Sequence, residues 1–170
     1  MLHLYVVRHS EAVDLGEAGV TRDEDRMLSS DGRKRADVVA QALKALDVHP
    51  RVAASSPLPR ALETAEVLLK VIAPDVAAQT CDFLKPGAKP QAVLDWLKER
   101  KTRSAMIVGH MPDLDDIVLF CITGKSGKGL HLKKAAVACV RFEEEVAPGG
   151  GELDWLLQPD QMKLIARFVR

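Results

Sequence analysis

The chain has 170 residues, a normal size for one domain, and 47% of them are hydrophobic, which is enough for a substantial core. Its 24 Lys and Arg residues balance its 24 Asp and Glu residues, so the formal net charge is zero. This balance argues against nucleic acid or an anionic membrane surface as the partner. We therefore expect a single domain over residues 1–170, with no nucleic-acid partner and no membrane partner.

Hydrophobic segments and cysteines indicate a cytoplasmic protein. No apolar run approaches the roughly 18 residues of a membrane span, and the first run reaches a charge at Arg8, too early for a signal-peptide core. The three cysteines, Cys81, Cys121 and Cys139, have no Cys-x-x-Cys spacing and lie in or beside apolar segments. We interpret them as buried, reduced thiols.

Segments typical of strands and helices alternate along the chain. The expected elements are a strand over 2–7, a polar loop or mobile flap over 11–27, a helix capped by Ser29 or Ser30 with Leu46 on its inner face, a strand over 51–55, a helix from Pro57 to Pro74, a weak strand over 76–81, a helix over 90–100, a strand over 105–108 and a helix from Pro112 to about Gly124. Strands over 135–142 and 153–157 then flank a Pro-Gly-Gly-Gly turn, and a short helix over 162–169 follows. This order predicts an α/β fold, a three-layer α/β/α sandwich with a mostly parallel sheet and an antiparallel edge.

Three of the predicted strands lead into arginine or histidine. Arg8 and His9 follow the first strand, Arg60 lies in the first turn after the second, and His110 follows the strand over 105–108. The carboxyl ends of parallel strands form the edge at which open sheets bind ligands. Two guanidiniums and two imidazoles there suit a phosphate dianion, because guanidinium forks bind oxygens in pairs. Taken singly, each residue has an ordinary structural reading, such as pairing of Arg60 with Glu63 or Glu66.

Four short motifs occur around these residues. They are Val-Arg-His-Ser-Glu-Ala at 7–12, Leu-Ser-Ser-Asp-Gly at 28–32, Ser-Pro-Leu-Pro-Arg-Ala at 56–61 and Val-Gly-His-Met-Pro at 108–112. With these four motifs in this order, the chain resembles the histidine phosphatase superfamily, also called phosphoglycerate mutase-like. Within that superfamily it resembles the small SixA-type phosphohistidine phosphatases. The resemblance implies the phosphoglycerate mutase-like fold.

The resemblance also implies roles for the four residues. His9 is expected to be the nucleophile that accepts the phosphoryl group, while Arg8, Arg60 and His110 bind its oxygens. A neutral imidazole is a competent nucleophile near pH 7, and fixed donors stabilise the charge that spreads over the equatorial oxygens. His110 is expected to act as a protonated donor beside the dianion. The arginines supply positive charge, so we expect no metal and no other cofactor.

The general acid is left open by the sequence. Larger mutases and phosphomonoesterases of the family supply a glutamate after the third strand, whereas residues 80–87 here read Thr-Cys-Asp-Phe-Leu-Lys-Pro-Gly. Asp82 and Glu11 are the candidate acids. A phosphorylated imidazole is already activated to leave, so the missing glutamate favours a P–N substrate. Ser10, which stands where many members have Gly or Thr, and the backbone of Met111 are further candidates for substrate binding.

The sequence therefore predicts a metal-independent, cytoplasmic phosphohistidine phosphatase with a phospho-His9 intermediate. By resemblance, its partner is a histidine phosphotransfer domain or a phosphotransferase-system protein. Two alternatives stay open: a small-molecule phosphomonoesterase for sugar or nucleotide phosphates, and a non-catalytic phosphoprotein-binding module. The basic segment from Lys125 to Lys134 lacks phosphate-loop spacing, and we interpret it as a solvated loop, with docking of an acidic phosphoprotein as the lesser alternative.

Overall fold

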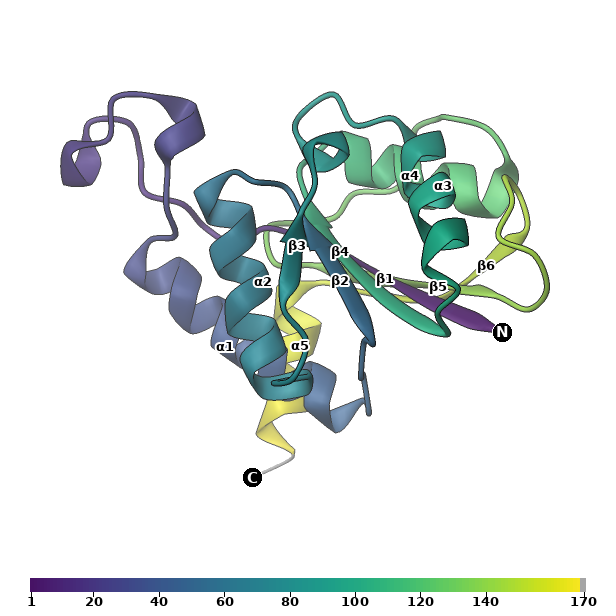
Figure 1. The fold of residues 1–170 in the computed structure, drawn as a ribbon. Helices are drawn as coiled ribbons and strands as arrows, with labels where there is room; N and C mark the ends of the chain where they lie inside the picture. Colours follow the sequence, from purple (N-terminus) through teal and green to yellow (C-terminus); the bar gives the residue numbers. More distant parts are fainter. Residues whose placement is uncertain (169–170) are drawn as a thin grey trace.

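A computed structural model describes residues 1–168 and contains a six-stranded sheet with the order β3-β2-β4-β1-β5-β6 (Figure 1). The strands are β1 (Leu2–Arg8), β2 (Val52–Ser55), β3 (Ala78–Thr80), β4 (Ser104–Gly109), β5 (Val137–Phe142) and β6 (Gly151–Leu157). Strands β3, β2, β4 and β1 pair in parallel, whereas β5 pairs antiparallel with both β1 and β6. The predicted parallel sheet with an antiparallel edge is confirmed.

Helices cover both faces of this sheet. They are α1 (Ser30–Ala45), α2 (Pro59–Ile72), α3 (Pro90–Arg100), α4 (Asp113–Thr123) and α5 (Pro159–Arg167). Helices α1, α2 and α5 lie on one face, and α3 and α4 lie on the other (Figure 1). Alternate residues of β1 serve the two cores, with Leu4 and Val6 packed among residues of α3 and α4, and Tyr5 and Val7 among residues of α1 and α2. The three-layer prediction is confirmed.

Some element boundaries differ from the sequence-based prediction. Helix α2 begins at Pro59 rather than Pro57, because Leu58 precedes a proline and adopts an extended backbone conformation. Arg60 nevertheless keeps its place in the first turn. Leu46 is exposed, since α1 ends one residue before it. The C-terminal helix starts earlier than predicted, at Pro159, and its predicted end at Val169 lies outside the described residues.

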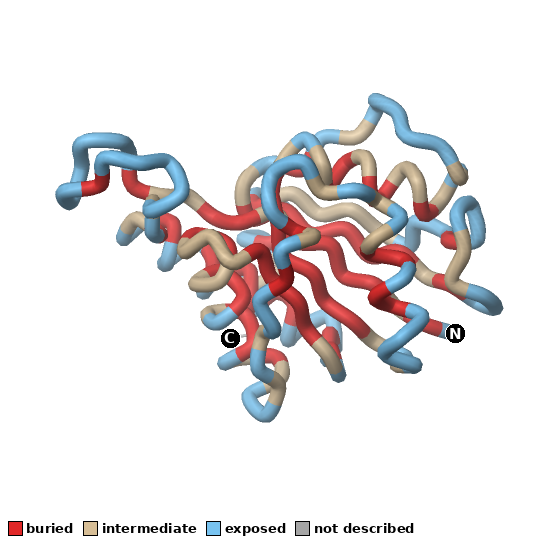
Figure 2. Tube along the Cα trace, turned by 45° about the horizontal axis from the view of Figure 1, so that its top comes forward, coloured by how far each residue is buried: buried red, intermediate tan, exposed pale blue. Residues whose placement is uncertain are grey.

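The polar segment after β1 is partly ordered. It contains two 3-10 helices, η1 (Glu17–Gly19) and η2 (Asp23–Asp25). Its base is closed by an isolated bridge between Ala12 and Leu28 and by a hydrogen bond of 3.0 Å from Val13 N to Met27 O. We call residues 14–26 the flap. Figure 1 shows it, in purple, extending beyond α1 and α2, and Figure 2 shows that it is almost entirely exposed.

The three cysteines are all buried and free, as the sequence predicts. Within the part of the chain that the structure describes, no helix is long and apolar enough to span a bilayer.

Candidate active site

His9 and His110 come together where two parallel neighbours, β1 and β4, end. Arg8 is the register partner of Gly109, so the two residues that follow lie side by side at the carboxyl edge of the sheet. Their ring centroids are 5.1 Å apart, with 54° between the ring planes. Both side chains are nearly removed from solvent, since His9 is 9% exposed and His110 is 4% exposed. The strand pairing therefore builds a pair of buried imidazoles at this edge.

The ring of His9 has a defined tautomer. Its Nδ1 lies 2.7 Å from the carbonyl oxygen of Ser10, and a carbonyl only accepts, so Nδ1 carries the proton and donates it. In the neutral ring the lone pair then resides on Nε2. Burial lowers the pKa of His9 to about 3, with smaller contributions from the charges of His110, Arg60 and Arg8. His9 is thus neutral at pH 7, with one nitrogen free to attack an electrophile.

His110 is held by the turn between β2 and α2. A hydrogen bond of 2.8 Å joins its Nε2 to the hydroxyl of Ser56. Burial, followed by the charge of Arg60, lowers the pKa of His110 to about 4. His110 is therefore neutral at pH 7 in this structure, whereas the sequence predicts a protonated donor beside a bound dianion. A bound dianion would raise this pKa, so protonation of His110 is coupled to ligand binding.

Arg8 is fixed through the segment that connects α4 to β5. Its Nη1 donates to the carbonyl of Leu132 over 2.7 Å, and the N–H of Leu132 donates to Oδ1 of Asp115 over 3.1 Å. Asp115 is a buried carboxylate in the first turn of α4. Its charge opposes the effect of burial, which lowers the pKa of Arg8. The Nε of Arg8 is buried and has no hydrogen-bond partner among the described residues.

Arg60 has a partner that the sequence did not indicate. Its Nη1 donates to the backbone oxygen of Asp23 over 2.6 Å, and its Nη2 donates to Oδ2 of the same residue over 2.9 Å. Asp23 belongs to the flap, 37 residues earlier in the chain. The pairings weighed from helical spacing do not form, since Glu63 instead accepts from Leu28 N over 3.0 Å and from Arg33 Nη2 over 2.9 Å.

Ser10 belongs to the framework of the site. Its N–H donates to the hydroxyl of Thr64 over 3.0 Å, and that hydroxyl donates to the backbone oxygen of Arg60 over 2.7 Å. The Ser10 hydroxyl donates to the backbone oxygen of Gly32 over 2.8 Å. These bonds already use the groups of Ser10 that sequence reasoning considered for substrate binding. Met111 directly follows His110 at the same edge and is half-buried.

Gly32, the last residue of the motif over 28–32, has a steric role beside this framework. A Cβ atom at this position would lie 2.0 Å from the backbone oxygen of Glu11, closer than any real contact. Only glycine lets the start of α1 approach the segment after His9 so closely. The hydroxyl of Ser29 caps the same helix by accepting from the N–H of Gly32.

The two candidate acids are engaged elsewhere. Asp82 is exposed and lies 2.9 Å from Lys85 Nζ. Glu11 lies 2.9 Å from Arg35 Nη1, and its Oε2 lies 3.0 Å from the Ser10 hydroxyl, whose one proton goes to the nearer oxygen of Gly32. Among the described residues, the carboxylate that binds one of the two site arginines directly is Asp23. Sequence reasoning missed it because nothing in the acidic run Asp23-Glu24-Asp25 distinguishes one member from the next.

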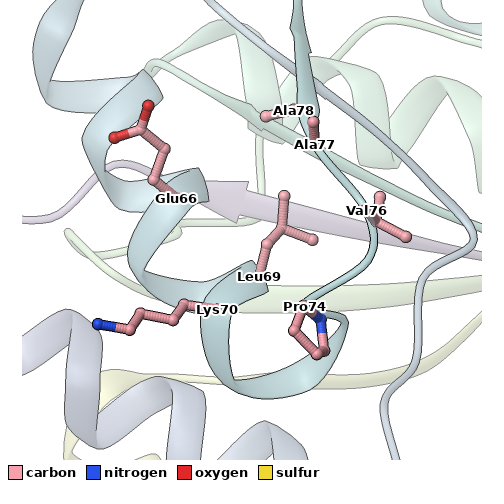
Figure 3. Close-up of a pocket in the computed structure, with 7 residues that line it drawn as sticks. All are labelled: Glu66, Leu69, Lys70, Pro74, Val76, Ala77 and Ala78. Atoms are coloured by element: carbon pink, nitrogen blue, oxygen red, sulfur yellow. The ribbon is translucent and has the colours of Figure 1, made fainter.

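A surface cavity of about 560 Å³ opens beside Asp23. The tip of the flap forms one wall, and Leu58 with Lys85 and Pro86 forms the other. A second cavity of about 310 Å³ lies between the end of α2 and β3, at the amino-terminal edge of the sheet, and Figure 3 shows its lining by Glu66, Lys70 and apolar side chains. Among residues 1–168, no group of three or more His, Cys, Asp and Glu residues could hold a metal ion.

Comparison with known proteins identifies the family. The model of the histidine phosphatase superfamily (branch 1) matches residues 4–85. An uncharacterized protein from Picosynechococcus sp. is 35% identical over 144 residues, which cover 82% of this chain and 85% of that protein. The chain belongs to the histidine phosphatase superfamily, and with it to the phosphoglycerate mutase-like α/β fold.

Two further similar proteins differ in the share of their length that aligns with this chain. The mitochondrial serine/threonine-protein phosphatase Pgam5 of Drosophila ananassae is 36% identical over 87 residues, 51% of this chain but only 29% of that protein. The solved structure of the protein histidine phosphatase SixA complexed with tungstate superposes with a TM-score of 0.81 at 21% identity, over 95% of this chain and 100% of that chain. At this identity the likeness to SixA shows a shared fold.

Proposed function

We propose that this protein is a phosphohistidine phosphatase that removes the phosphoryl group from a protein histidine through a phospho-His9 intermediate. The observation that carries the proposal is the state of His9. It is buried and neutral, its Nδ1 donates to the Ser10 carbonyl, and it lies beside His110 and within reach of the charges of the buried Arg60 and the half-buried Arg8. A nucleophile with a fixed tautomer among cationic donors suits in-line transfer of a phosphoryl group.

The reaction has two steps. Nε2 of His9 attacks phosphorus, and the bond between phosphorus and the substrate imidazole breaks. The substrate ring is already protonated on its other nitrogen, so it leaves as neutral imidazole without taking a proton from the enzyme. Water then attacks phospho-His9, and inorganic phosphate and neutral His9 are formed. Arg8, Arg60 and His110 hold the phosphoryl oxygens in both steps, with His110 protonated when the dianion is bound. The arginines provide the positive charge, so activity is expected to persist in EDTA.

The positions of the carboxylates support a P–N substrate. An alkoxide needs a proton as it leaves, whereas an imidazole is a much better leaving group. Asp82 and Glu11 each form an ion pair with a basic side chain rather than standing free beside the two imidazoles. The open cavity beside Asp23 is lined by flap residues and by Leu58, Lys85 and Pro86 rather than by the imidazoles, and its charged walls suit contact with the surface of a protein that presents the phosphoryl group. The partner is then a phosphohistidine-bearing protein, such as a histidine phosphotransfer domain or a phosphotransferase-system protein, in the cytoplasm.

The decisive variant is His9→Ala. It is expected to lower turnover of a phosphohistidine protein by at least about a thousandfold, because the bond-forming atom is removed. Acid-labile radiolabelled phosphate is expected on the wild-type chain after rapid quenching and is expected to be absent from the variant. His49→Ala is the matched control, since His49 bonds to Ile72 O and Asp47 at the far edge of the sheet. Near-normal turnover by the His9 variant would refute the mechanism.

Substrate class is tested by parallel assays on a phosphohistidine protein, a phosphoserine peptide and a sugar phosphate. We expect the highest kcat/KM for phosphohistidine. Faster turnover of either ester, with a loss of that activity in Glu11→Gln or Asp82→Asn, would favour a phosphomonoesterase that uses one of these acids. Binding of the phosphoprotein without turnover would favour the non-catalytic module.

A further inference from the structure

The flap contacts the proposed phosphate site through a single acidic residue. Both terminal nitrogens of Arg60 donate to Asp23, one to its backbone oxygen and one to its carboxylate. Resting on the proposed function, we infer that the Asp23 carboxylate is bound to Arg60 in the free enzyme and is displaced by the incoming phosphoryl group. This competition between two anions determines how tightly the site binds phosphate.

The contact uses the donors that a phosphoryl group needs. A guanidinium binds phosphate best through pairs of N–H groups, and Asp23 now engages Nη1 and Nη2 together. The ion pair is asymmetric in burial, since the side chain of Arg60 is 7% exposed and that of Asp23 is 60% exposed. Arg60 is held within the domain, whereas Asp23 can move into water at little cost. The exchangeable member of the pair is therefore the carboxylate.

The structure of the flap allows this exchange. Neither η1 nor η2 contains a buried residue, and Val20 is the one buried side chain between residues 14 and 26. Little packing is lost when such a segment shifts about its base at Val13 and Met27. Asp23 also keeps a partner that travels with it, because Arg26 Nη1 donates to Oδ1 over 3.1 Å. The carboxylate released from Arg60 is therefore not left unpaired.

Charge makes the two anions mutually exclusive. The hydrogen bond from Arg26, ahead of the contribution of Arg60, lowers the pKa of Asp23, so this carboxylate is ionised at pH 7. A phosphoryl dianion bound to Arg60 would lie beside the Asp23 carboxylate, and neighbouring negative charges repel each other. If Asp23 dissociates from Arg60 as the ligand binds, the cost of breaking this ion pair is included in the free energy of both the ground-state complex and the transition state. Relative to the free enzyme, both are destabilised equally. Asp23 then raises KM and leaves kcat unchanged.

The test compares Asp23→Asn with Asp25→Asn. Both substitutions remove one negative charge from η2, but Asp25 pairs with Arg22 rather than with the site, so it controls for long-range electrostatics. The measurements are calorimetric titration with inorganic phosphate, and kcat and KM for a phosphohistidine protein. We expect Asp23→Asn to bind phosphate about fivefold more tightly and to lower KM by a similar factor, the scale of one partly exposed ion pair, with kcat unchanged. Asp25→Asn is expected to match the wild type.

Two outcomes would overturn the inference. Unchanged or weaker phosphate binding in Asp23→Asn would show that the carboxylate does not compete, and a fall in kcat would show that it positions Arg60 instead. Asp23→Ala and thermal melting of each variant exclude misfolding as the cause. Normal wild-type turnover with unaltered phosphate affinity in Asp23→Asn refutes only this inference. Tighter phosphate binding in a protein without phosphatase activity refutes only the proposed function.

Discussion

The two arginines of the candidate site are supported in opposite ways. Arg8 donates to the backbone carbonyl of Leu132, a residue whose N–H is bound by the buried carboxylate of Asp115. Arg60 donates instead to a carboxylate on the exposed flap. The first guanidinium is preorganised by the core, as electrostatic catalysis requires, and the second is covered by an anion that can leave. One half of the site is thus fixed in advance, whereas the other half responds to the ligand.

The largest effect is expected from removing either guanidinium. Arg8→Met and Arg60→Met are each expected to lower kcat/KM by about a hundred- to a thousandfold, because each removes fixed positive charge from the transferring phosphoryl group. The two variants are expected to differ in how firmly the flap is held, since only Arg60→Met removes the hydrogen-bond partner of Asp23. Limited trypsin digestion, with cleavage after Arg22 and Arg26 followed by mass spectrometry, is expected to be faster in Arg60→Met alone. Equal digestion of both variants would contradict the distinction between the two supports.

A smaller effect is expected from substitution of Asp115, which binds the residue whose carbonyl accepts from Arg8. Asp115→Ala leaves the buried N–H of Leu132 without its acceptor, which is expected to lower the free energy of unfolding by about 1–3 kcal/mol. It also loosens the carbonyl that holds Arg8, so we expect kcat to fall about tenfold, a loss of about 1.4 kcal/mol in transition-state stabilisation.

The matched control for this variant is Asp116→Ala. Asp116 accepts from Gly127 N over 2.9 Å in the same connecting segment, but it is more exposed than Asp115 and binds Gly127 rather than Leu132. We expect it to change stability by no more than about 0.5 kcal/mol and to keep normal kcat. Chemical denaturation and steady-state kinetics measure both quantities. Equal losses in the two variants would assign the effect to general anchoring of the segment rather than to Arg8.

The smallest expected effect is a decrease in the free energy of unfolding in mildly acidic solution. His9 and His110 have folded pKa values of about 3 and 4, below the unfolded value of about 6.5, so the unfolded state binds more protons as the pH falls through 6.5. Between pH 7 and pH 6 the free energy of unfolding is expected to fall by roughly 0.7 kcal/mol for each imidazole. Denaturation curves of the wild type and His9→Gln measure this, and the variant is expected to lose about half as much.

The flap contact has a different pH window. The pKa of Asp23 is held below its ordinary value, chiefly by the hydrogen bond from Arg26, so its stabilising contribution is lost only as the pH falls through that lowered pKa. Trypsin digestion of the flap is therefore expected to give the same relative protection of wild type over Arg60→Met at pH 7 and at pH 6. Loss of this protection at pH 6 would assign the anchoring of the flap to a histidine instead.

Much of the fold was readable from local patterns. The strand over 2–7 and the helix over 90–100 follow from runs of apolar residues and from Pro at a helix start, and of the two serines that the sequence offered as caps of α1 the structure uses Ser29. The start of α2 was placed two residues too early, because Pro57 and Pro59 are both acceptable in a first helical turn and only the constraint on Leu58 separates them. Local rules thus predict which elements exist more reliably than where they begin.

The sequence by itself predicted which residues belong to the candidate site. Arg8, His9, Arg60 and His110 were recognisable because they follow strands in the order of a known set of motifs, and the carboxyl ends of parallel strands must share an edge. The tertiary structure alone decided what surrounds them: the carbonyl that fixes the tautomer of His9, the buried Asp115 behind Arg8, and the choice of Asp23 rather than Glu63 as the partner of Arg60. Hydrogen bonds and ion pairs depend on distances of about 3 Å between segments far apart in the chain, and such distances exist only after the layers have packed.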